Sequence, residues 1–135
     1  MDDSELIALA AEAREKAYAP YSGFKVGAAL LTADGSVFTG CNIENSSYGL
    51  TVCAERVAVM TAVAAGQKEI VKLAVITNNS PPLAPCGACR QVLVEFAPRA
   101  EVIAVSTKGE SRRWTATELL PDRPILLRPP ACGIG

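Results

Sequence analysis

Residues 53–77 read CAERVAVMTAVAAGQKEIVKLAVIT, in which a helix signal is followed directly by a strand signal. Residues 53–65 are apolar nearly all round, which is typical of a helix that is buried on more than one side, and Gly66 suits the position just beyond its end. The β-branched run at 71–77 predicts a buried strand. A helix that alternates with a buried strand indicates an α/β fold.

The same alternation extends in both directions along the chain. Before residue 53 the sequence predicts a helix with Ser4 as its N-cap, and two strands joined by a hairpin turn at Asp34-Gly35. After residue 77 it predicts a helix, a strand and one helical turn with capping-box spacing at 115–118. The expected ranges are 4–17, 26–31, 37–41, 86–96 and 101–106. This order implies a central sheet covered on both faces, in a single domain of residues 1–135.

Composition limits the classes of function that the chain can have. Half of its 135 residues are hydrophobic, which favours extra buried surface such as a subunit interface. No apolar run reaches about 18 residues, so no membrane span is expected. The acidic start Met1-Asp2-Asp3 lacks a signal-peptide pattern, so a cytoplasmic location is expected. The net charge of −1, with Arg112-Arg113 as the one adjacent basic pair, argues against a nucleic-acid partner.

The chain has five cysteines and no histidine, so a protein-bound metal ion would need thiolates or carboxylates. An odd number of cysteines in a chain expected in the cytoplasm argues against a disulfide framework. Three of them lie at two predicted helix starts: Cys53, and Cys86 with Cys89 in a Cys-x-x-Cys pair. Cys41 is expected to be a small buried residue, and Cys132 a free thiol in an irregular tail.

The clustered cysteines have the pattern of a catalytic zinc site. A helix N-terminus favours negative charge and lowers the pKa of a thiol, which helps metal binding. Cys53, Cys86 and Cys89 supply three protein ligands for Zn²⁺ and leave the fourth tetrahedral position for water. Glu55 lies on the same helical turn as Cys53, where its carboxylate can accept the proton that such a water releases. The predicted cofactor is therefore Zn²⁺, and Glu55 is the predicted catalytic residue.

An all-thiolate site has an electrostatic consequence. Three thiolates around one divalent ion carry surplus negative charge, which weakens zinc as a Lewis acid. Positive groups nearby would offset this charge. Arg56, next to the site in sequence, is the leading candidate, and Arg90 is a second.

Other interpretations of the cysteines stay open. A Cys-x-x-Cys pair can hold a structural zinc ion or act in redox chemistry, and Cys41 or Cys132 could supply a fourth ligand. The segment Cys53-Ala54-Glu55 at a helix start favours the catalytic interpretation.

Further motifs occur in order along most of the chain. They are YAPYSGFKVGAAL at 18–30, GCNIENSSYGL at 40–50, CAER at 53–56, PCGACRQVL at 85–93 and ELLP at 118–121. Over residues 5 to 121 the sequence resembles the small, homotetrameric, zinc-dependent cytidine deaminases, and its cysteine and glutamate spacing is that of zinc deaminases in general. The resemblance implies a cytidine deaminase-like fold, a three-layer α/β/α sandwich with a mixed five-stranded sheet.

The resemblance also implies roles for residues outside the zinc site. Asn42 and Glu44 would hydrogen-bond the ribose hydroxyls, which suits their donors and acceptors, and Phe24 would pack near the nucleoside. The backbone around Ala54 would contact the base. Tyr48 would reach into the site of a neighbouring subunit, so the active sites of a homotetramer would be shared.

The C-terminal segment departs from the family pattern. The family commonly has an aromatic residue a few positions after Leu-Leu-Pro, which stacks in an adjacent site, but here Pro121 is followed by DRPIL. Ile125 or Leu126 would have to replace it by apolar contact.

By resemblance, the expected reaction is hydrolytic deamination of cytidine, and of 2′-deoxycytidine, in pyrimidine salvage. Glu55 would take a proton from the zinc-activated water, deliver it to N3 of the base and carry a proton to the departing amine. Three alternatives stay open: a deaminase of the same fold that acts on blasticidin S, a nucleic-acid-editing deaminase, and a non-catalytic zinc-binding module. Asn42 and Glu44 favour a ribonucleoside substrate.

Overall fold

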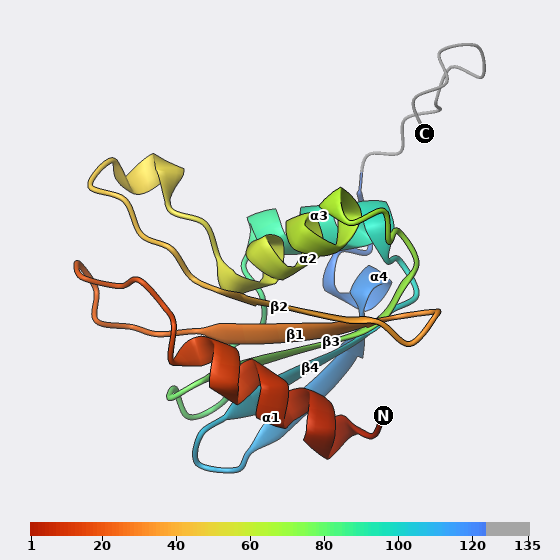
Figure 1. The fold of residues 1–135 in the computed structure, drawn as a ribbon, viewed down its shortest axis with the longest axis horizontal. Helices are drawn as coiled ribbons and strands as arrows, with labels where there is room; N and C mark the ends of the chain where they lie inside the picture. The colour runs from red at the N-terminus through yellow and green to blue at the C-terminus, as the bar shows by residue number, and fades with distance from the viewer. Residues whose placement is uncertain (124–135) are drawn as a thin grey trace.

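The structure, a computed structural model, describes residues 1–123 and has a five-stranded mixed sheet at its centre (Figure 1). The strand order is β2-β1-β3-β4-β5, in which β3 and β4 pair in parallel and the other neighbours are antiparallel. The strands are β1 Gly27–Thr32, β2 Val37–Cys41, β3 Ile70–Thr77, β4 Glu101–Ser106 and β5 Ser111–Thr115. The helices are α1 Asp3–Arg14, the 3₁₀ turn η1 Tyr48–Leu50, α2 Ala54–Ala64, α3 Gly87–Phe96 and α4 Ala116–Leu119.

The helices lie on both faces of the sheet, so the molecule has three layers. α1 covers one face, and α2, α3 and α4 cover the other (Figure 1). Successive strand residues point to opposite faces: Ala29 and Ala74 pack with α1, whereas Leu30 and Leu73 pack with α2 and α3. This arrangement confirms the expected three-layer α/β/α sandwich. Among residues 1–123, no helix combines the length and the apolar character needed to cross a membrane.

The first helix differs from its prediction at both ends. It begins at Asp3 with Asp2, not Ser4, as its N-cap. Asp2 Oδ1 accepts the Glu5 backbone N–H at 2.9 Å and the Ser4 hydroxyl at 2.8 Å. A carboxylate is favoured at the positive end of a helix, so the acidic residue caps it and the serine hydroxyl turns towards the carboxylate. The helix also ends at Arg14, before the expected residue 17.

Strand β5 was not found from residue pattern alone. Its first three residues are Ser111, Arg112 and Arg113, all exposed, because β5 is an edge strand that pairs with β4 on one side. The guanidinium of Arg112 lies over the Trp114 ring, 4.6 Å from its centroid. The capping box that follows is confirmed: the Glu118 carboxylate accepts the Thr115 backbone N–H at 2.9 Å and opens α4.

Gly40 allows α2 to lie directly on β2. A Cβ atom at this position would lie 2.5 Å from the carbonyl oxygen of Ala54 and 2.5 Å from the backbone nitrogen of Ala58. Both alanines are fully buried, so neither can move aside without shifting the helix. The glycine therefore sets how closely the sheet approaches the helix that begins after Cys53.

We expect Gly40→Ala to lower the free energy of unfolding by about 2 kcal/mol or more, because the added methyl group overpacks a backbone contact. Urea denaturation of both proteins measures the difference. Gly49→Ala is the matched control, since a Cβ there meets nothing within 4 Å, and we expect it to change stability by less than about 0.5 kcal/mol. Equal stability of the Gly40→Ala protein and the wild type would contradict this account of the helix position.

Candidate active site

Two loops bring the predicted metal ligands to one edge of the sheet. β1 is antiparallel to both β2 and β3, so β2 and β3 run in the same direction and end at the same edge. The chain leaves β2 at this edge to reach α2, and leaves β3 there to reach α3. Cys53 and Cys86 are the N-cap residues of these two helices, and Cys89 lies in the first turn of α3.

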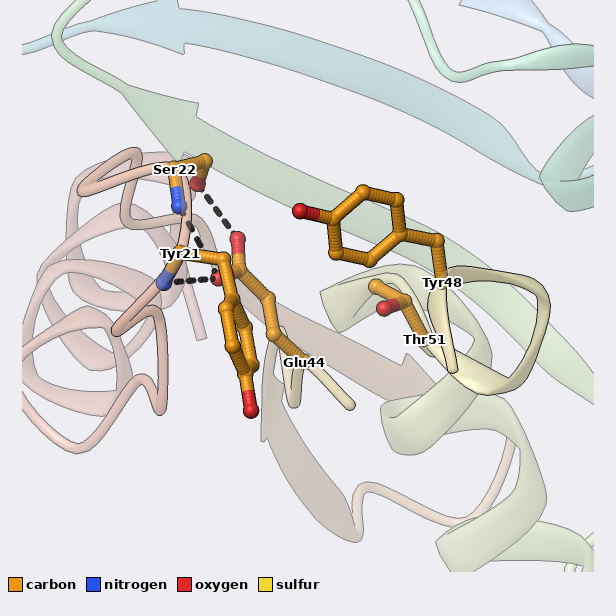
Figure 2. A pocket seen from close by; sticks show the side chains of 5 residues that line it. All are labelled: Tyr21, Ser22, Glu44, Tyr48 and Thr51. Carbon is orange, nitrogen blue, oxygen red and sulfur yellow. Dashed lines mark hydrogen bonds between the residues drawn. The ribbon is translucent and has the colours of Figure 1, made fainter. Parts of the chain in front are cut away.

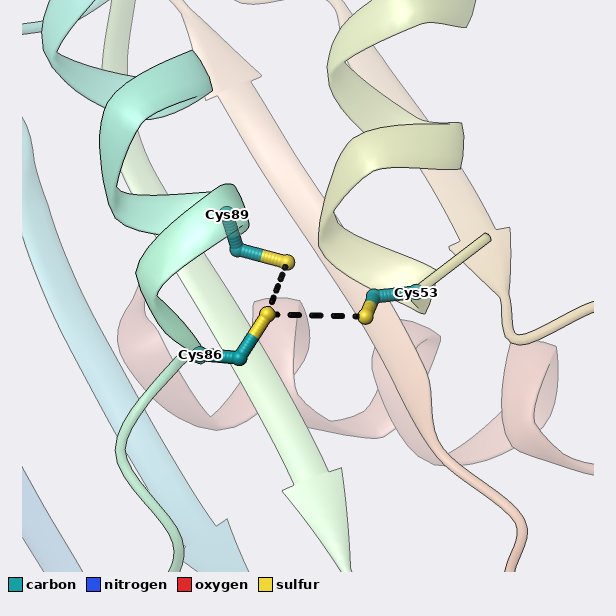
Figure 3. A group of neighbouring side chains, drawn as sticks. All are labelled: Cys53, Cys86 and Cys89. Atoms are coloured by element: carbon teal, nitrogen blue, oxygen red, sulfur yellow. Dashed lines mark hydrogen bonds between the residues drawn. The ribbon is translucent and has the colours of Figure 1, made fainter. Parts of the chain in front are cut away.

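The three sulfur atoms face one another between the starts of α2 and α3 (Figure 3). Cys53 Sγ lies 3.7 Å from Cys86 Sγ, Cys86 Sγ lies 3.5 Å from Cys89 Sγ, and all three lie within 4.8 Å of one another. A tetrahedral zinc ion with Zn–S bonds of about 2.3 Å separates its sulfur ligands by about 3.8 Å. The observed spacing therefore fits three thiolates on one zinc ion. Cys41 is not part of this group.

The protonation of the thiols also fits a metal site. Hydrogen bonding with Cys89, and then with Arg56 and Cys86, lowers the pKa of Cys53 to about 5 although burial opposes it. The same hydrogen bond, together with burial, raises the pKa of Cys89. Cys53 is thus a thiolate at neutral pH, and thiolates are ligands that suit zinc.

Glu55 lies beside the cysteines in a desolvated position. It is the second residue of α2 and only 6% exposed. Burial raises the pKa of its carboxyl group to about 7, and the negative charge on Cys53 acts in the same direction. A carboxyl group with a pKa near 7 can both accept and release a proton at neutral pH, as general acid–base catalysis requires.

A cavity of about 230 Å³ opens onto Glu55, Cys53 and Cys86. The rest of its wall is mostly apolar, and is formed by Phe24, Val26, Asn42, Thr51, Val75, Thr77, Leu83 and Ala84. Sequence reasoning found Phe24 and Asn42 but missed the others. Thr77 is the last residue of β3, and the tendency of sites to form at strand ends could have indicated it. Leu83 lies in a proline-rich loop and has no comparable signal.

A second cavity, of about 390 Å³ (Figure 2), shares Thr51 with the first. Tyr21, Ser22, Glu44 and Tyr48 form the rest of its wall. Glu44 and Tyr48 therefore lie in this cavity and not in the one beside the cysteines. The rings of Tyr21 and Tyr48 meet edge to face with centroids 6.0 Å apart, and Tyr48 is 75% exposed.

Asn42 and Ala54 are both buried at the first cavity or beside it. Asn42 Oδ1 accepts the Val26 backbone N–H at 2.9 Å, and Asn42 Nδ2 donates to the Phe24 carbonyl oxygen at 2.8 Å. An amide side chain has two hydrogens and two lone pairs, so Asn42 keeps one of each for a ligand. Ala54 is the first residue of α2, directly after Cys53.

The two candidate arginines have different partners. Arg56 Nη2 lies 3.5 Å from Cys53 Sγ, and this hydrogen bond raises the pKa of Arg56. Its Nε is buried and has no hydrogen-bond partner within residues 1–123. Arg90 was expected as a second compensating charge, but it donates to the carbonyl oxygens of Pro85 at 2.7 Å and Leu119 at 3.0 Å. It therefore connects the loop before α3 to α4.

The site combines three convergent thiols, a buried carboxyl group that titrates near neutrality, and a cavity open to both. These are the parts of a hydrolytic zinc enzyme. Comparison with known proteins identifies the family. Residues 1–116 match the family model described as the cytidine and deoxycytidylate deaminase zinc-binding region. The chain belongs to this zinc-dependent deaminase family, and Zn²⁺ is its cofactor.

Several relatives are similar over most of their length. The chain is 51% identical to cytidine deaminase of Halalkalibacterium halodurans over 122 residues, which cover 90% of this chain and 92% of that protein. The solved structure of cytidine deaminase from Burkholderia pseudomallei matches with a TM-score of 0.88 and 54% identity, covering 90% of this chain and 98% of that one. Cytidine deaminase from Mycobacterium tuberculosis matches with a TM-score of 0.80 and 41% identity, covering 93% and 99% of the two chains.

These comparisons confirm the family, the fold class and the zinc cofactor that the sequence predicted. Ile125, Leu126 and Cys132, to which the sequence analysis gave roles, lie outside the described residues.

We expect Cys86→Ser to lose most of its zinc, because two thiolates and a hydroxyl hold the ion far more weakly than three thiolates. Zinc is measured by plasma mass spectrometry after gel filtration. Cys41→Ser is the control: burial raises the pKa of the Cys41 thiol, and we expect this variant to keep its zinc. Equal loss of zinc from the two variants would contradict the assignment of the ligands.

Proposed function

We propose that the chain catalyses the hydrolytic deamination of cytidine, and of 2′-deoxycytidine, to uridine, deoxyuridine and ammonia in pyrimidine salvage. The observation that carries this proposal is the position of Glu55, whose buried carboxyl group shares one cavity with Cys53 and Cys86. Relatives at about half identity over most of the chain bear the name cytidine deaminase, which supports the substrate class.

Glu55 moves the protons of the reaction. When bound by Cys53, Cys86 and Cys89, zinc supplies a water molecule that is acidic enough to react at neutral pH. Glu55 accepts the proton that this water loses and passes it to N3 of the base, which makes C4 more electrophilic. After the water oxygen has added to C4, Glu55 takes the proton of the new C4 hydroxyl and transfers it to the amino group, which leaves as ammonia while C4 becomes a carbonyl. The pKa of about 7 allows the same carboxyl group to serve in both directions.

Arg56 adjusts the charge of the site. Three thiolates give the zinc centre surplus negative charge, which holds back deprotonation of water. The hydrogen bond from Arg56 Nη2 to Cys53 Sγ withdraws part of that charge. We assign Arg56 this role, and assign Arg90 the purely structural one described above.

The remaining residues bind the nucleoside. With the base in the cavity beside the cysteines, its ring lies against Phe24 and the Ala54 backbone, and the sugar extends past Thr51 to the second cavity. Asn42 then offers its free hydrogen and lone pair to the ribose, and Glu44 offers its carboxylate.

The chain is proposed to act as a homotetramer in the cytoplasm, with no nucleic-acid or membrane partner. The second cavity is wide, and Tyr48 on its rim is three-quarters exposed, so a neighbouring subunit can complete the site. A cluster of free thiols suits a reducing compartment.

Glu55→Gln tests the mechanism. We expect zinc to be retained and turnover of cytidine to fall by at least about 100-fold, because the amide cannot carry a proton. Uridine formation and ammonia release are measured together with zinc content. Glu12→Gln, the same change on an exposed residue of α1 across the sheet, is the control and keeps full activity. Near-normal turnover of zinc-loaded Glu55→Gln would overturn the assignment.

A substrate panel tests the proposed specificity. Ammonia release is compared for cytidine, 2′-deoxycytidine, blasticidin S and a cytosine-containing oligonucleotide at equal concentration. We expect the two free nucleosides to react fastest, because Asn42 and Glu44 lie where they can hold a sugar. Reaction of the oligonucleotide or of blasticidin S without reaction of cytidine would overturn the proposed substrate.

A further inference from the structure

The Glu44 carboxylate is held in place by residues 21 and 22. Its Oε1 accepts the backbone N–H groups of Tyr21 at 2.9 Å and Ser22 at 3.1 Å, and its Oε2 accepts the Ser22 hydroxyl (Figure 2). Ser22 is the one side chain among residues 1–123 seen to donate to this carboxylate. Its substitution therefore changes the environment of Glu44 while the two backbone donors stay in place.

The Ser22 hydroxyl has a defined direction. Its oxygen accepts the backbone N–H of Phe24 at 3.0 Å, so its own hydrogen is left to point at Glu44. Gly23, between them, has φ = +69°, and its N–H donates to the Ala19 carbonyl oxygen at 2.9 Å. The left-handed conformation of Gly23 thus permits the turn in which the Phe24 N–H points back to the Ser22 hydroxyl.

These contacts leave Glu44 able to accept one more donor on Oε2. An ionised carboxylate has about four lone-pair positions, and three are occupied by the Tyr21, Ser22 backbone and Ser22 side-chain donors. The hydrogen bond from the Ser22 side chain holds the pKa of Glu44 below its usual range, so the carboxylate is charged at neutral pH. A charged acceptor with one free position suits a single sugar hydroxyl.

The position of Glu44 also fits a contact with the sugar. Glu44 lines the second cavity, which shares Thr51 with the cavity beside the cysteines. Glu55 lines the cavity beside the cysteines. A nucleoside whose base lies near Glu55 therefore presents its sugar along the wall that Glu44 and Ser22 form. An unrestrained glutamate would have to lose rotamer freedom each time it bound a hydroxyl, whereas Ser22 fixes it in advance.

We propose that Ser22 is a positioning residue for substrate binding: its hydroxyl fixes the Glu44 carboxylate so that Oε2 accepts one ribose hydroxyl. This inference rests on the proposed function, and it adds Ser22 to the residues that determine sugar specificity. Because the contact forms equally in the ground state and the transition state, Ser22 affects KM and leaves kcat unchanged.

The test measures kcat and KM of wild type, Ser22→Ala and Ser22→Thr with cytidine, 2′-deoxycytidine and 3′-deoxycytidine. With cytidine we expect Ser22→Ala to raise KM about fivefold with kcat within about twofold of wild type, as suits the cost of ordering one side chain on binding. Ser22→Thr keeps the hydroxyl and restores KM. With the deoxynucleoside that lacks the hydroxyl bound by Glu44, Ser22→Ala has no effect on KM.

A second comparison separates positioning from folding. In a Glu44→Ala background, Ser22→Ala causes no further rise in KM if serine acts only through the carboxylate. An unchanged KM of Ser22→Ala for cytidine would overturn the inference, and so would an equal rise in KM for all three nucleosides. In either case, activity of the wild type on cytidine would still support the proposed function. A zinc-loaded wild type that releases ammonia from none of the three would overturn the proposed function, and this inference with it.

Discussion

The meeting of two helix N-termini over one edge of the sheet is the constraint on which the site depends. It exists because β1 lies between β2 and β3 and is antiparallel to both, which sends the chain out of β2 and β3 at the same edge. The sulfur atoms of Cys53 and Cys86 then lie 3.7 Å apart although the two residues are 33 positions apart in the sequence. Gly40 on β2 lets α2 keep this position, since the backbone of α2 lies where a side chain at residue 40 would be. Sulfur ligands at two helix starts also gain from the positive ends of both helices.

The meeting of the two helix starts also sets the acid–base properties of Glu55, because it buries the carboxyl group beside charged side chains. Glu55 is buried next to a thiolate, and both influences raise the pKa of its carboxyl group. Arg56 Nη2 lies 3.5 Å from Cys53 Sγ, where its positive charge opposes part of that negative charge. An acid that titrates near neutrality beside a metal-activated water is what deamination requires, because one group must move a proton first from the water and later to the amine. The proposed sugar-binding side has a second set of contacts, in which Asn42 and Glu44 hold the segment 21–26 that carries Phe24.

Residue pattern predicted those parts of the fold that have strong local signals. The helix at 53–65, the buried strand at 71–77 and the hairpin around Gly35 are local features, and each is present in the structure. Edge strand β5 was missed because its exposed Ser-Arg-Arg start has no apolar alternation, and the α1 cap was misplaced because two residues with capping side chains compete there. Cysteine spacing and the lack of histidine predicted the metal ligands. The partners of Arg90, and the hydrogen bonds of Asn42 and Glu44 to a segment about 20 residues away, depend on tertiary packing and could not be predicted from spacing.

The central claim is that three thiolates bind zinc and leave one position open to water. X-ray absorption spectroscopy at the zinc edge of the purified protein tests it directly, because sulfur and oxygen ligands differ in scattering and in bond length. The account predicts three sulfur ligands at about 2.3 Å and one oxygen at about 2.0 Å, in the protein without substrate. Four sulfur ligands and no oxygen would contradict it, since a closed site has no place for the water that reacts.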